Sequence, residues 1–297
     1  MSDVKVTGKP KREYPMETYA ELKAFHDKIK KKRREIGISN DSAWYRGVSF
    51  GGSFDKHGKL LQEDPAKIYK LLPGLLRDEW FCSSELRKQF RIEKQLYVGF
   101  YTESQSGFPQ KLSSWEVLAV MRHSGLPTRL LDWTDNLFAA IYFALCYGTN
   151  SQTADPNWSP GIWILNPYRL NDRELGTPHI LGLETPFTFD YFDTILGGGS
   201  WPRALPISIA PYWATSRIRG QRGYFTAHGS NLRPMEITCR GSLEYIPISK
   251  SLVPLLLDEL ELAGIGHHTM FPDFDGIGRQ MKERFYQPDH AVSQLLT

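Results

Sequence analysis

The stretch Met121-Arg-His-Ser-Gly-Leu-Pro-Thr-Arg-Leu-Leu-Asp-Trp-Thr134 leads directly into the segment Asp135 to Tyr147. Its first part combines polar and amphipathic groups with backbone breaks at Gly125 and Pro127. The following segment contains an apolar run over residues 137–145. A helix that is apolar on nearly all sides is buried, so this run predicts a core helix. Polar side chains beside such a helix are costly unless they have partners, which makes them the first candidates for a functional site.

The composition indicates a globular chain without membrane-spanning segments. The 297 residues are 41% hydrophobic, which is enough for a sizeable core. The longest apolar run is shorter than the roughly 20 residues that cross a bilayer, and no N-terminal secretion pattern is visible. The three cysteines, Cys82, Cys146 and Cys239, are odd in number and widely spaced. This usage suits a reduced compartment, so we expect a cytoplasmic protein that does not contact a membrane.

Positive charge is concentrated near the N-terminus. Residues 1–40 hold 11 Lys and Arg against 6 Asp and Glu, a net charge of +5. The other 257 residues hold 25 against 27, a net charge of −2. Any general attraction to polyanions is therefore expected from the N-terminal segment and not from the rest of the chain.

The N-terminal segment divides into a disordered part and a helix. Residues 1–15 are polar and are expected to be disordered. A helix over 16–37 follows in the prediction, opened by a capping box of Thr18 and Glu21 and ended by a glycine. Its basic face spans 28–34. That face is either simply solvated or contacts a nucleic acid or an acidic protein partner.

The remaining pattern predicts one domain, so that residues 16–297 form a single unit including the basic helix. Residues 166–204, rich in Gly, Pro, Asp and Thr, are expected to be a long irregular segment. Ser113 and Glu116 form a second capping box, and Asp132 or Thr134 is expected to cap the core helix. Further helices are expected near 84–101, 251–263 and 276–286. Strands are expected near 44–48, 128–131, 161–165, 206–210, 223–227, 235–239 and 243–248.

Some of these strands alternate with helices and others follow one another directly. This order favours an α+β fold with a mixed or mainly antiparallel sheet and flanking helices. No internal repeat or evident linker divides the chain between residues 16 and 290.

Several motifs resemble the FRG domain family, which is named for a Phe-Arg-Gly signature. They are Tyr45-Arg46-Gly47, Leu72-Pro73 with Arg77, and the block from His123 to Thr134 with Ala140-x-Tyr142-Phe143-Ala144. Later pieces at 217–226, 264–265 and 271–276 agree, so the resemblance extends over about 40–285. Tyr45 replaces the signature phenylalanine and keeps an aromatic ring. Some members of the family are associated with bacterial defence or toxin-like contexts, so the resemblance implies a bacterial toxin or phage-defence role.

A second resemblance is to ADP-ribosyltransferases of the Arg-Ser-Glu type. These enzymes begin with an aromatic-Arg-Gly strand and continue with a strand that ends in Ser or Thr before a helix. They finish with a loop that bears a catalytic glutamate just before a strand. The corresponding positions here are Arg46, Thr134 and Gln221. This resemblance implies NAD as the substrate and an ADP-ribosyltransferase-like arrangement of the sheet, but glutamine stands where the family has glutamate.

The resemblance implies roles for individual residues, and each role has a structural alternative. Arg46 would bind the NAD pyrophosphate, with Gly47 allowing close approach; alternatively Arg46 pairs with Asp132. Thr134 would contact the nicotinamide ribose, and Asp132 would act as acid, base or arginine partner, unless one of them only caps the helix. Trp133 either stacks on the ligand or packs in the core.

His123 and Arg129 are the remaining candidates for binding. His123 is expected at a helix C-terminus, where the helix dipole favours a cationic imidazole; the alternative is that it contacts the ligand or carries a proton. Arg129 lies between apolar residues on a strand and needs either an internal carboxylate or a bound anion.

Gln221 is the residue on which transferase chemistry depends. A glutamine still accepts a hydrogen bond from a ribose hydroxyl but brings no negative charge, and transition-state electrostatics are commonly worth a few kcal/mol. A carboxylate from Asp132, Glu184 or Glu236 would have to supply that charge. Other chemistries have less support, because no phosphate-loop motif is present and the spacing of His267, His268, Asp273 and Asp275 matches no zinc pattern, so no metal is expected.

These patterns predict an NAD-binding, ADP-ribosyltransferase-like effector or defence toxin that modifies a nucleic acid or a protein. In this prediction Gln221, Asp132 and Thr134 act in catalysis, whereas Arg46, Gly47, His123, Arg129 and Trp133 bind the cofactor. The alternative is a recognition module that binds an anionic ligand or partner without chemistry, and a hydrolase or nuclease is the third reading. The sequence gives no oligomeric state.

Overall fold

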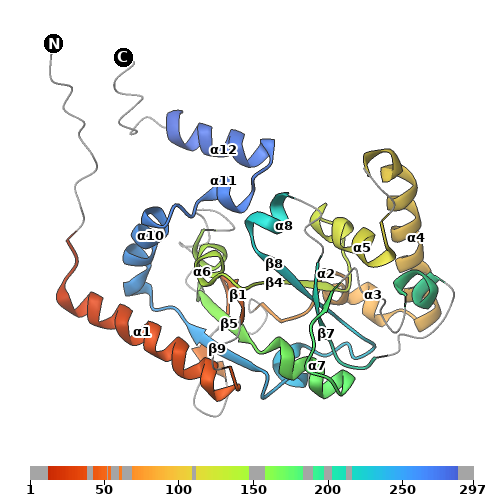
Figure 1. The fold of residues 1–297 in the computed structure, drawn as a ribbon, viewed down its shortest axis with the longest axis horizontal. Helices are drawn as coiled ribbons and strands as arrows, with labels where there is room; N and C mark the ends of the chain where they lie inside the picture. Colours follow the sequence, from red (N-terminus) through yellow and green to blue (C-terminus); the bar gives the residue numbers. More distant parts are fainter. Residues whose placement is uncertain are drawn as a thin grey trace.

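Seven strands form one twisted sheet in the order β6-β7-β8-β4-β1-β5-β9 in the computed structural model (Figure 1). Only β6 and β7 pair in parallel among these strands; the other neighbours are antiparallel. The structure describes residues 13–38, 43–51, 53–54, 60–61, 69–108, 112–146, 158–182, 190–196, 203–211 and 216–286. The strands are β1 (Trp44–Val48), β4 (Leu130–Thr134), β5 (Gly161–Leu165), β6 (Leu181–Gly182), β7 (Ile207–Ala210), β8 (Gly223–Ala227) and β9 (Leu243–Pro247), and a separate hairpin joins β2 (Ser53–Phe54) to β3 (Leu60–Leu61).

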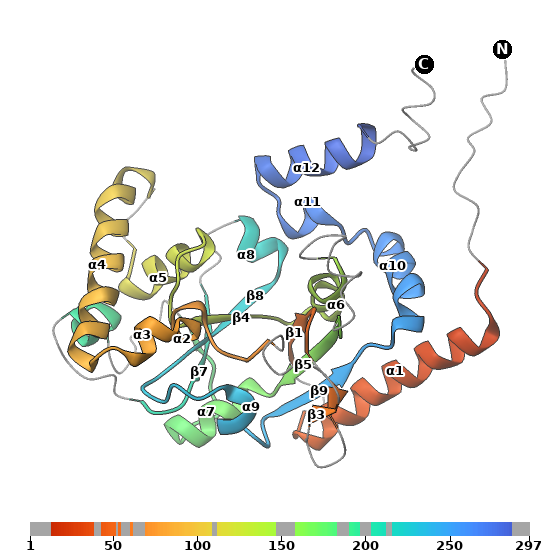
Figure 2. The same cartoon turned by 180° about the vertical axis from the view of Figure 1, so that it is seen from behind.

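Helices flank this sheet on both sides (Figures 1 and 2). They are α1 (Met16–Glu35), α2 (Gly74–Arg77), α3 (Glu79–Ser83), α4 (Leu86–Ser104), α5 (Ser114–His123), α6 (Leu137–Leu145), α7 (Pro167–Leu175), α8 (Ser216–Gly220), α9 (Met235–Thr238), α10 (Val253–Leu262), α11 (His267–Met270) and α12 (Phe274–Phe285), with short turns at Gln105–Gly107, Phe192–Leu196 and Lys250–Leu252. The mixed sheet with its flanking helices confirms the predicted α+β fold.

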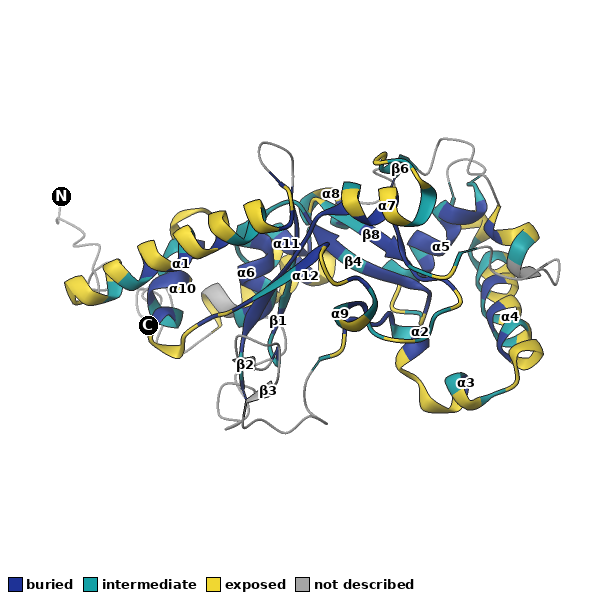
Figure 3. Ribbon diagram, turned by 90° about the horizontal axis from the view of Figure 1, so that it is seen from below, coloured by how far each residue is buried: buried dark blue, intermediate teal, exposed yellow. Residues whose placement is uncertain are grey.

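The core is divided into clusters on the two faces of the sheet. Apolar residues of α1, α6 and α10 pack together with Tyr45 and Ile164 on one face. A second cluster joins α4 and α5 to β7 and β8. The third contains Trp44, Trp133 and Trp163 with residues of α7 and α9. Figure 3 shows the sheet and α6 mostly buried, whereas the outward faces of α1 and α4 are exposed.

The predicted core helix is α6, and it contacts β1 very closely. Ala139, Ala140 and Ile141 are fully buried. A Cβ atom built on Gly47 would lie 1.8 Å from the carbonyl oxygen of Ala140. Glycine is therefore required at this position by the packing of α6, whereas the sequence interpretation had assigned Gly47 to the approach of a ligand.

The cap of α6 differs from the prediction. Asn136 is the N-cap, and its side-chain oxygen accepts a hydrogen bond from the Phe138 amide at 3.0 Å. Asp132 and Thr134 belong to β4, which extends beyond the expected end at residue 131 because Asp132 to Thr134 pair with β8. The prediction of Asp132 or Thr134 as the cap was therefore wrong.

Other local predictions had mixed outcomes. The capping box of Ser113 and Glu116 is confirmed at the start of α5. The box of Thr18 and Glu21 is not formed, since α1 already begins at Met16 and the Glu21 carboxylate accepts a hydrogen bond from Ser251 at 2.7 Å.

Two segments differ in secondary structure. The strand expected at 235–239 is the short helix α9, which follows Pro234 and buries Met235 and Cys239 on one side. The described parts of the segment 166–204 are less irregular than expected, because Asn166 caps α7 and β6 adds an edge strand; residues 183–189 and 197–202 lie outside the described part. The predicted disorder of residues 1–15 falls mostly on residues 1–12, which lie outside the described part.

The sheet opens between β1 and β4. These two neighbouring strands share one paired position, Tyr45 with Thr134. In contrast, β1 pairs with β5 at five positions and β4 pairs with β8 at five. The two halves of the sheet therefore separate beyond Tyr45, and the side chains of Arg46 and Asp132 lie at the opening.

Candidate functional site: a cationic pocket where the sheet opens

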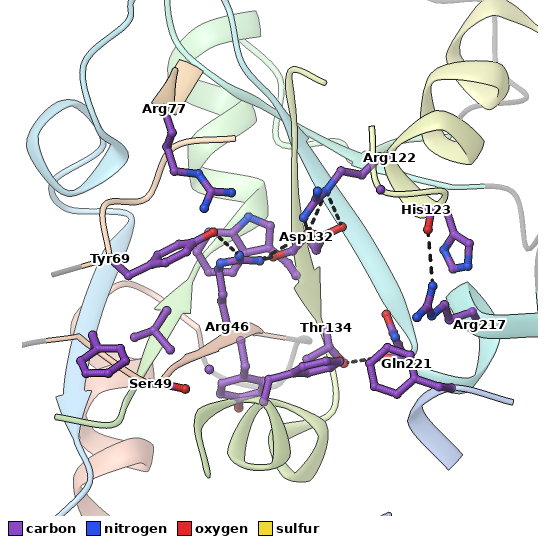
Figure 4. A pocket seen from close by; sticks show the side chains of 18 of the residues that line it. Arg46, Ser49, Tyr69, Arg77, Arg122, His123, Asp132, Thr134, Arg217 and Gln221 are labelled. Atoms are coloured by element: carbon purple, nitrogen blue, oxygen red, sulfur yellow. Dashed lines mark hydrogen bonds and ion pairs between the residues drawn. The ribbon is translucent and has the colours of Figure 1, made fainter. Parts of the chain in front are cut away.

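A cavity of about 950 Å³ lies at this opening. Its size is at the upper end of the range for small-molecule sites. Its wall combines β1, the segment before and within α2, the end of α5, β4, α8 with its following turn, and Phe271 (Figure 4). The lining residues that carry charge or strong polarity are Arg46, Ser49, Tyr69, Lys70, Arg77, Arg122, His123, Asp132, Thr134, Arg217 and Gln221.

Arg46 connects the two separated halves of the sheet. Its Nη1 donates to the main-chain oxygen of Asp132 and lies 3.6 Å from the Asp132 carboxylate, while Nη2 donates to the Tyr69 hydroxyl at 2.8 Å. The side chain is only 14% exposed. The sequence left two roles open for Arg46, phosphate binding or pairing with Asp132, and the structure shows the pairing. The guanidinium nevertheless borders the pocket, so the pairing does not remove it from the wall.

Asp132 is held more tightly by Arg122 than by Arg46. Arg122 Nη2 and Nε donate to one carboxylate oxygen of Asp132 at 2.6 and 3.1 Å. Burial opposes ionisation of Asp132, but the positive charges of Arg122 and Arg46 outweigh it and lower its pKa below the ordinary value. Asp132 is therefore a carboxylate at neutral pH and partly neutralises two arginines.

Arg77 faces the same space with fewer partners. Its guanidinium lies over the Tyr69 ring, 4.7 Å from the centroid, and no hydrogen bond or ion pair to it is found within the described residues. Burial, together with the charges of Arg46 and Arg122, lowers the pKa of Arg77. Figure 4 shows the three guanidinium groups converging around Tyr69 and Asp132. Such a cluster of cations favours a bound anion.

Thr134 and Gln221 meet at the other side of the pocket. The Thr134 hydroxyl donates to the main-chain oxygen of Gln221 at 2.7 Å and accepts from the Asn136 amide at 3.0 Å. The Gln221 side-chain amide donates to the Met270 oxygen at 2.9 Å. The segment between α8 and β8 is thereby fixed to both β4 and α11.

His123 and Arg217 lie next to Gln221. Arg217 donates to the main-chain oxygen of His123 at 3.4 Å and lies over the Phe271 ring, 4.4 Å from its centroid. Burial and the nearby charge of Arg217 lower the pKa of His123. The imidazole is therefore neutral at pH 7 while the pocket is empty of anions.

The structure brings together most of the residues expected from the sequence, but not all. Arg46, Gly47, His123, Asp132, Thr134 and Gln221 all line the pocket, and so does the largely buried Trp133. Trp133 is 3% exposed and its indole nitrogen donates to Thr226, so most of the ring packs in the core. Arg129 is outside the pocket wall: its guanidinium forms a paired hydrogen bond with the buried Glu93 at 2.6 and 2.7 Å. The internal carboxylate, not a bound anion, is its partner.

Of the carboxylates expected to support Gln221, Asp132 lines the same pocket and Glu236 does not. Glu236 is outside the pocket wall and accepts a hydrogen bond from the Leu71 amide at 3.1 Å. Glu184 lies outside the described residues. Among the described residues that line the pocket, Asp132 is the one carboxylate.

Sequence reasoning missed five residues of the cationic wall: Tyr69, Lys70, Arg77, Arg122 and Arg217. Arg77 and Arg217 stood within the quoted motifs, and Arg122 directly precedes His123 in the central stretch. The excess of arginines over the single aspartate Asp132 in these motifs is the signal from which a cationic site could have been predicted. Tyr69 and Lys70 carried no signal, because only the folded chain brings them to β1.

No metal site and no membrane-spanning helix are found in the part of the chain that the structure describes. It contains no group of three or more His, Cys, Asp and Glu side chains arranged to hold a metal ion. His267 instead contacts the Tyr142 hydroxyl at 3.0 Å. No helix within the described ranges is long and apolar enough to cross a bilayer.

The fold and the pocket define the class: an α+β domain with an arginine-rich, anion-attracting pocket where its sheet opens. Residues 64–153 match the family model of the FRG domain, so the chain contains an FRG domain. This segment includes Arg77, Arg122, Asp132 and Thr134 of the pocket. The motifs around Arg46 and beyond residue 216 lie outside it, and their likeness to the family stays a prediction. No curated protein and no solved structure matches the chain.

Proposed function

We propose that the pocket binds a nucleotide with negatively charged phosphates, and that NAD is its ligand in an ADP-ribosyltransferase-like arrangement. One observation carries the proposal. Four arginines and one lysine line the pocket against one carboxylate, as far as the described residues go. Guanidinium groups bind phosphates through two parallel hydrogen bonds, and the volume of about 950 Å³ suits a ligand as large as a dinucleotide.

The order of the strands supports NAD over a smaller anion. Arg46 lies on β1, and Thr134 ends the neighbouring β4, separated from α6 by two residues. Gln221 is separated by one residue from the start of β8, the next strand in the sheet. This is the sequence of elements that the transferase resemblance implies. In this arrangement the arginines around Asp132 would hold the pyrophosphate, and the nicotinamide ribose would lie toward Thr134 and Gln221.

A second candidate is binding of the nucleotide without transfer, and specific contacts favour it. The Gln221 amide already donates to Met270, and Asp132 is engaged by Arg122 and Arg46. Gln221 carries no negative charge, and that of Asp132 is already paired with two arginines. The lack of a free negative charge beside the ribose is expected to slow transfer strongly. In this case the domain would be a sensor for an anionic ligand.

Thermal denaturation with NAD, ADP-ribose and inorganic pyrophosphate tests the binding proposal. A rise in melting temperature with NAD and ADP-ribose that exceeds the rise with pyrophosphate is expected. No rise with any of the three would exclude the proposal. Release of nicotinamide from NAD then separates the two candidates, because only an active transferase or hydrolase of NAD produces it.

Replacing Arg77 with glutamine should weaken NAD binding about 10- to 100-fold, the loss expected for about 1.5–3 kcal/mol from a hydrogen bond to a charged group. The melting temperature should change little, since no hydrogen bond or ion pair to Arg77 is found within the described residues. Isothermal titration calorimetry measures the affinity. Arg87→Gln on the exposed side of α4 is the matched control. Equal losses in both variants would show a general charge effect and contradict a specific role.

Affinity for NAD should rise as the pH falls from 7.5 toward about 6, because negative phosphates bound in the same pocket favour the protonated imidazole of His123. Its pKa is lowered in the free pocket, so an anionic ligand raises it and binding takes up a proton. The phosphates of NAD are diesters and do not titrate in this range. Titration calorimetry in two buffers with different ionisation enthalpies measures the proton uptake on NAD binding. The same uptake in His123→Gln would show that a group other than His123 takes up the proton.

The proposal extends to a polyanionic or acidic target at the basic face of α1. Lys28, Lys30, Lys31 and Arg34 are exposed there. Lys30 and Lys31 lie 3.8 and 3.9 Å from Asp27 and Glu35, distances typical of weak surface pairs. In a bacterial defence toxin this face would contact the nucleic acid or protein that is modified. Salt-dependent binding of an oligonucleotide or acidic peptide tests the contact, and unchanged binding in Lys28→Glu with Arg34→Glu would exclude it.

A further inference from the structure

Helix α12 carries an apolar face that the described part of the chain does not bury. Phe274 is 92% exposed, Ile277 43% and Met281 40%. Their spacing of three and four residues aligns them on one side of the helix. In Figures 1 and 2, α12 lies outside the layers of the domain, and α11 is the element against which it chiefly packs. A helix of this length is marginal without a packed face.

Gly278 lies within this face and makes no close packing contact with the residues that the structure describes. A Cβ built there would meet no atom within 4 Å, and its φ is not in the left-handed region. Gly276, two residues earlier, differs: its Cβ would lie 1.8 Å from the Phe271 carbonyl oxygen. A glycine in the middle of a helix disfavours that helix relative to alanine. Close approach of another backbone would account for Gly278 at this position.

Acidic side chains lie at the start of α12 and basic ones further along it, with Arg279 between Asp275 and Lys282 on the same side, and an antiparallel copy complements this order. Asp273 caps the helix and Asp275 lies in its first turn, whereas Lys282 lies in the second half. Two copies that cross antiparallel near Gly278 would bring Phe274 of one beside Met281 of the other, and Asp275 beside Lys282. A parallel pair would instead oppose like charges and align the two helix dipoles unfavourably.

We propose that α12 is a self-association surface, on which a second copy of this chain docks through its own α12, antiparallel and crossing at Gly278. Such an interface is isologous, since the same residues serve on both copies. It is small, so the dimer is expected to be weak and concentration-dependent. The interface begins three residues after Phe271, which lines the pocket, and the two sites are therefore adjacent in the chain.

Sedimentation velocity on the full chain from about 1 µM to about 500 µM tests the proposal over the range of weak interfaces. The expected result is a reversible shift from monomer to dimer that Phe274→Lys abolishes. Leu262→Lys is the matched control, because Leu262 is 90% exposed on α10 and away from this face. A monomer at every concentration, or a dimer that persists in Phe274→Lys, would overturn the proposal.

Gly278→Ala gives a second, sharper readout. Alanine favours the helix, so the melting temperature should stay equal or rise, yet the added methyl group at the crossing should weaken the dimer at least about tenfold. Gly99→Ala is the control, since Gly99 is also exposed within a long helix and its Cβ would meet nothing within 4 Å. That variant should leave the dimer unchanged. Equal dimerisation of Gly278→Ala and the parent chain would contradict a close crossing at this residue.

Discussion

Replacing Arg129 with alanine is expected to lower the free energy of unfolding by about 3–5 kcal/mol, the loss typical when one partner of a buried ion pair is removed. Arg129 and Glu93 are 2% and 1% exposed, and two hydrogen bonds join them at 2.6 and 2.7 Å. Arg129 Nη1 also donates to the Gly229 oxygen at 2.9 Å. Without the guanidinium, the Glu93 carboxylate would remain buried, and among the described residues the weaker contact from the Tyr191 hydroxyl at 3.4 Å would be left to it.

Urea denaturation of Arg129→Ala measures this loss, and a double variant identifies its cause. Arg129→Met combined with Glu93→Leu removes both charges and fills the same space with apolar atoms. It should be clearly more stable than Arg129→Ala, because no uncompensated charge is then buried. A loss below about 1 kcal/mol in Arg129→Ala would show that water reaches the pair.

Replacing Gly47 with alanine should destabilise the protein by about 3 kcal/mol or more, at or beyond the upper end for overpacked cores. The added Cβ would lie 1.8 Å from the Ala140 oxygen and 2.7 Å from the Ala144 nitrogen. Both are backbone atoms of a buried helix, which cannot move aside as a flexible side chain does. Helix α6 would have to shift away from β1, and the wall of the pocket would shift with it.

Chemical denaturation and calorimetry of Gly47→Ala measure this effect, with Gly74→Ala as the control. A Cβ on Gly74 would meet its nearest atom at 3.6 Å, an ordinary contact distance. Gly74→Ala should therefore keep the stability of the parent chain to within about 1 kcal/mol. If Gly47→Ala were equally harmless, the close packing of α6 on β1 would be wrong.

Much of the fold was predictable because it depends on local chemistry. The apolar run of α6 and the buried strand β5 follow from hydrophobic pattern alone. The capping box of α5 also involves neighbours in sequence only. The wrong predictions of secondary structure concern segments whose conformation depends on tertiary contacts. Residues 132–134 are part of β4 because they pair with β8. Residues 235–238 form the helix α9, which follows Pro234 and packs on the core.

The candidate site was predictable in part for the same reason. Arg46, Thr134 and Gln221 were selected from separate motifs, and they line one pocket. Arg129 was also selected, because an arginine between apolar residues needs a partner. Its partner, Glu93, lies 36 positions away in the chain, and no local pattern marks it. The face of the sheet on which an ion-pair partner lies is known only once the strands are paired.

The sequence by itself determined the α+β class, the core helix and the stretch in which polar groups gather beside it. These properties depend on side-chain polarity and on the spacing of apolar residues along each helix or strand, both of which can be read from neighbouring residues. Only the tertiary structure decided that β1 and β4 separate after one paired position and that Tyr69, Arg77 and Arg217 join Arg46 there. The strength of a charge cluster depends on distances of a few ångströms between residues far apart in the chain, and those distances exist only after folding.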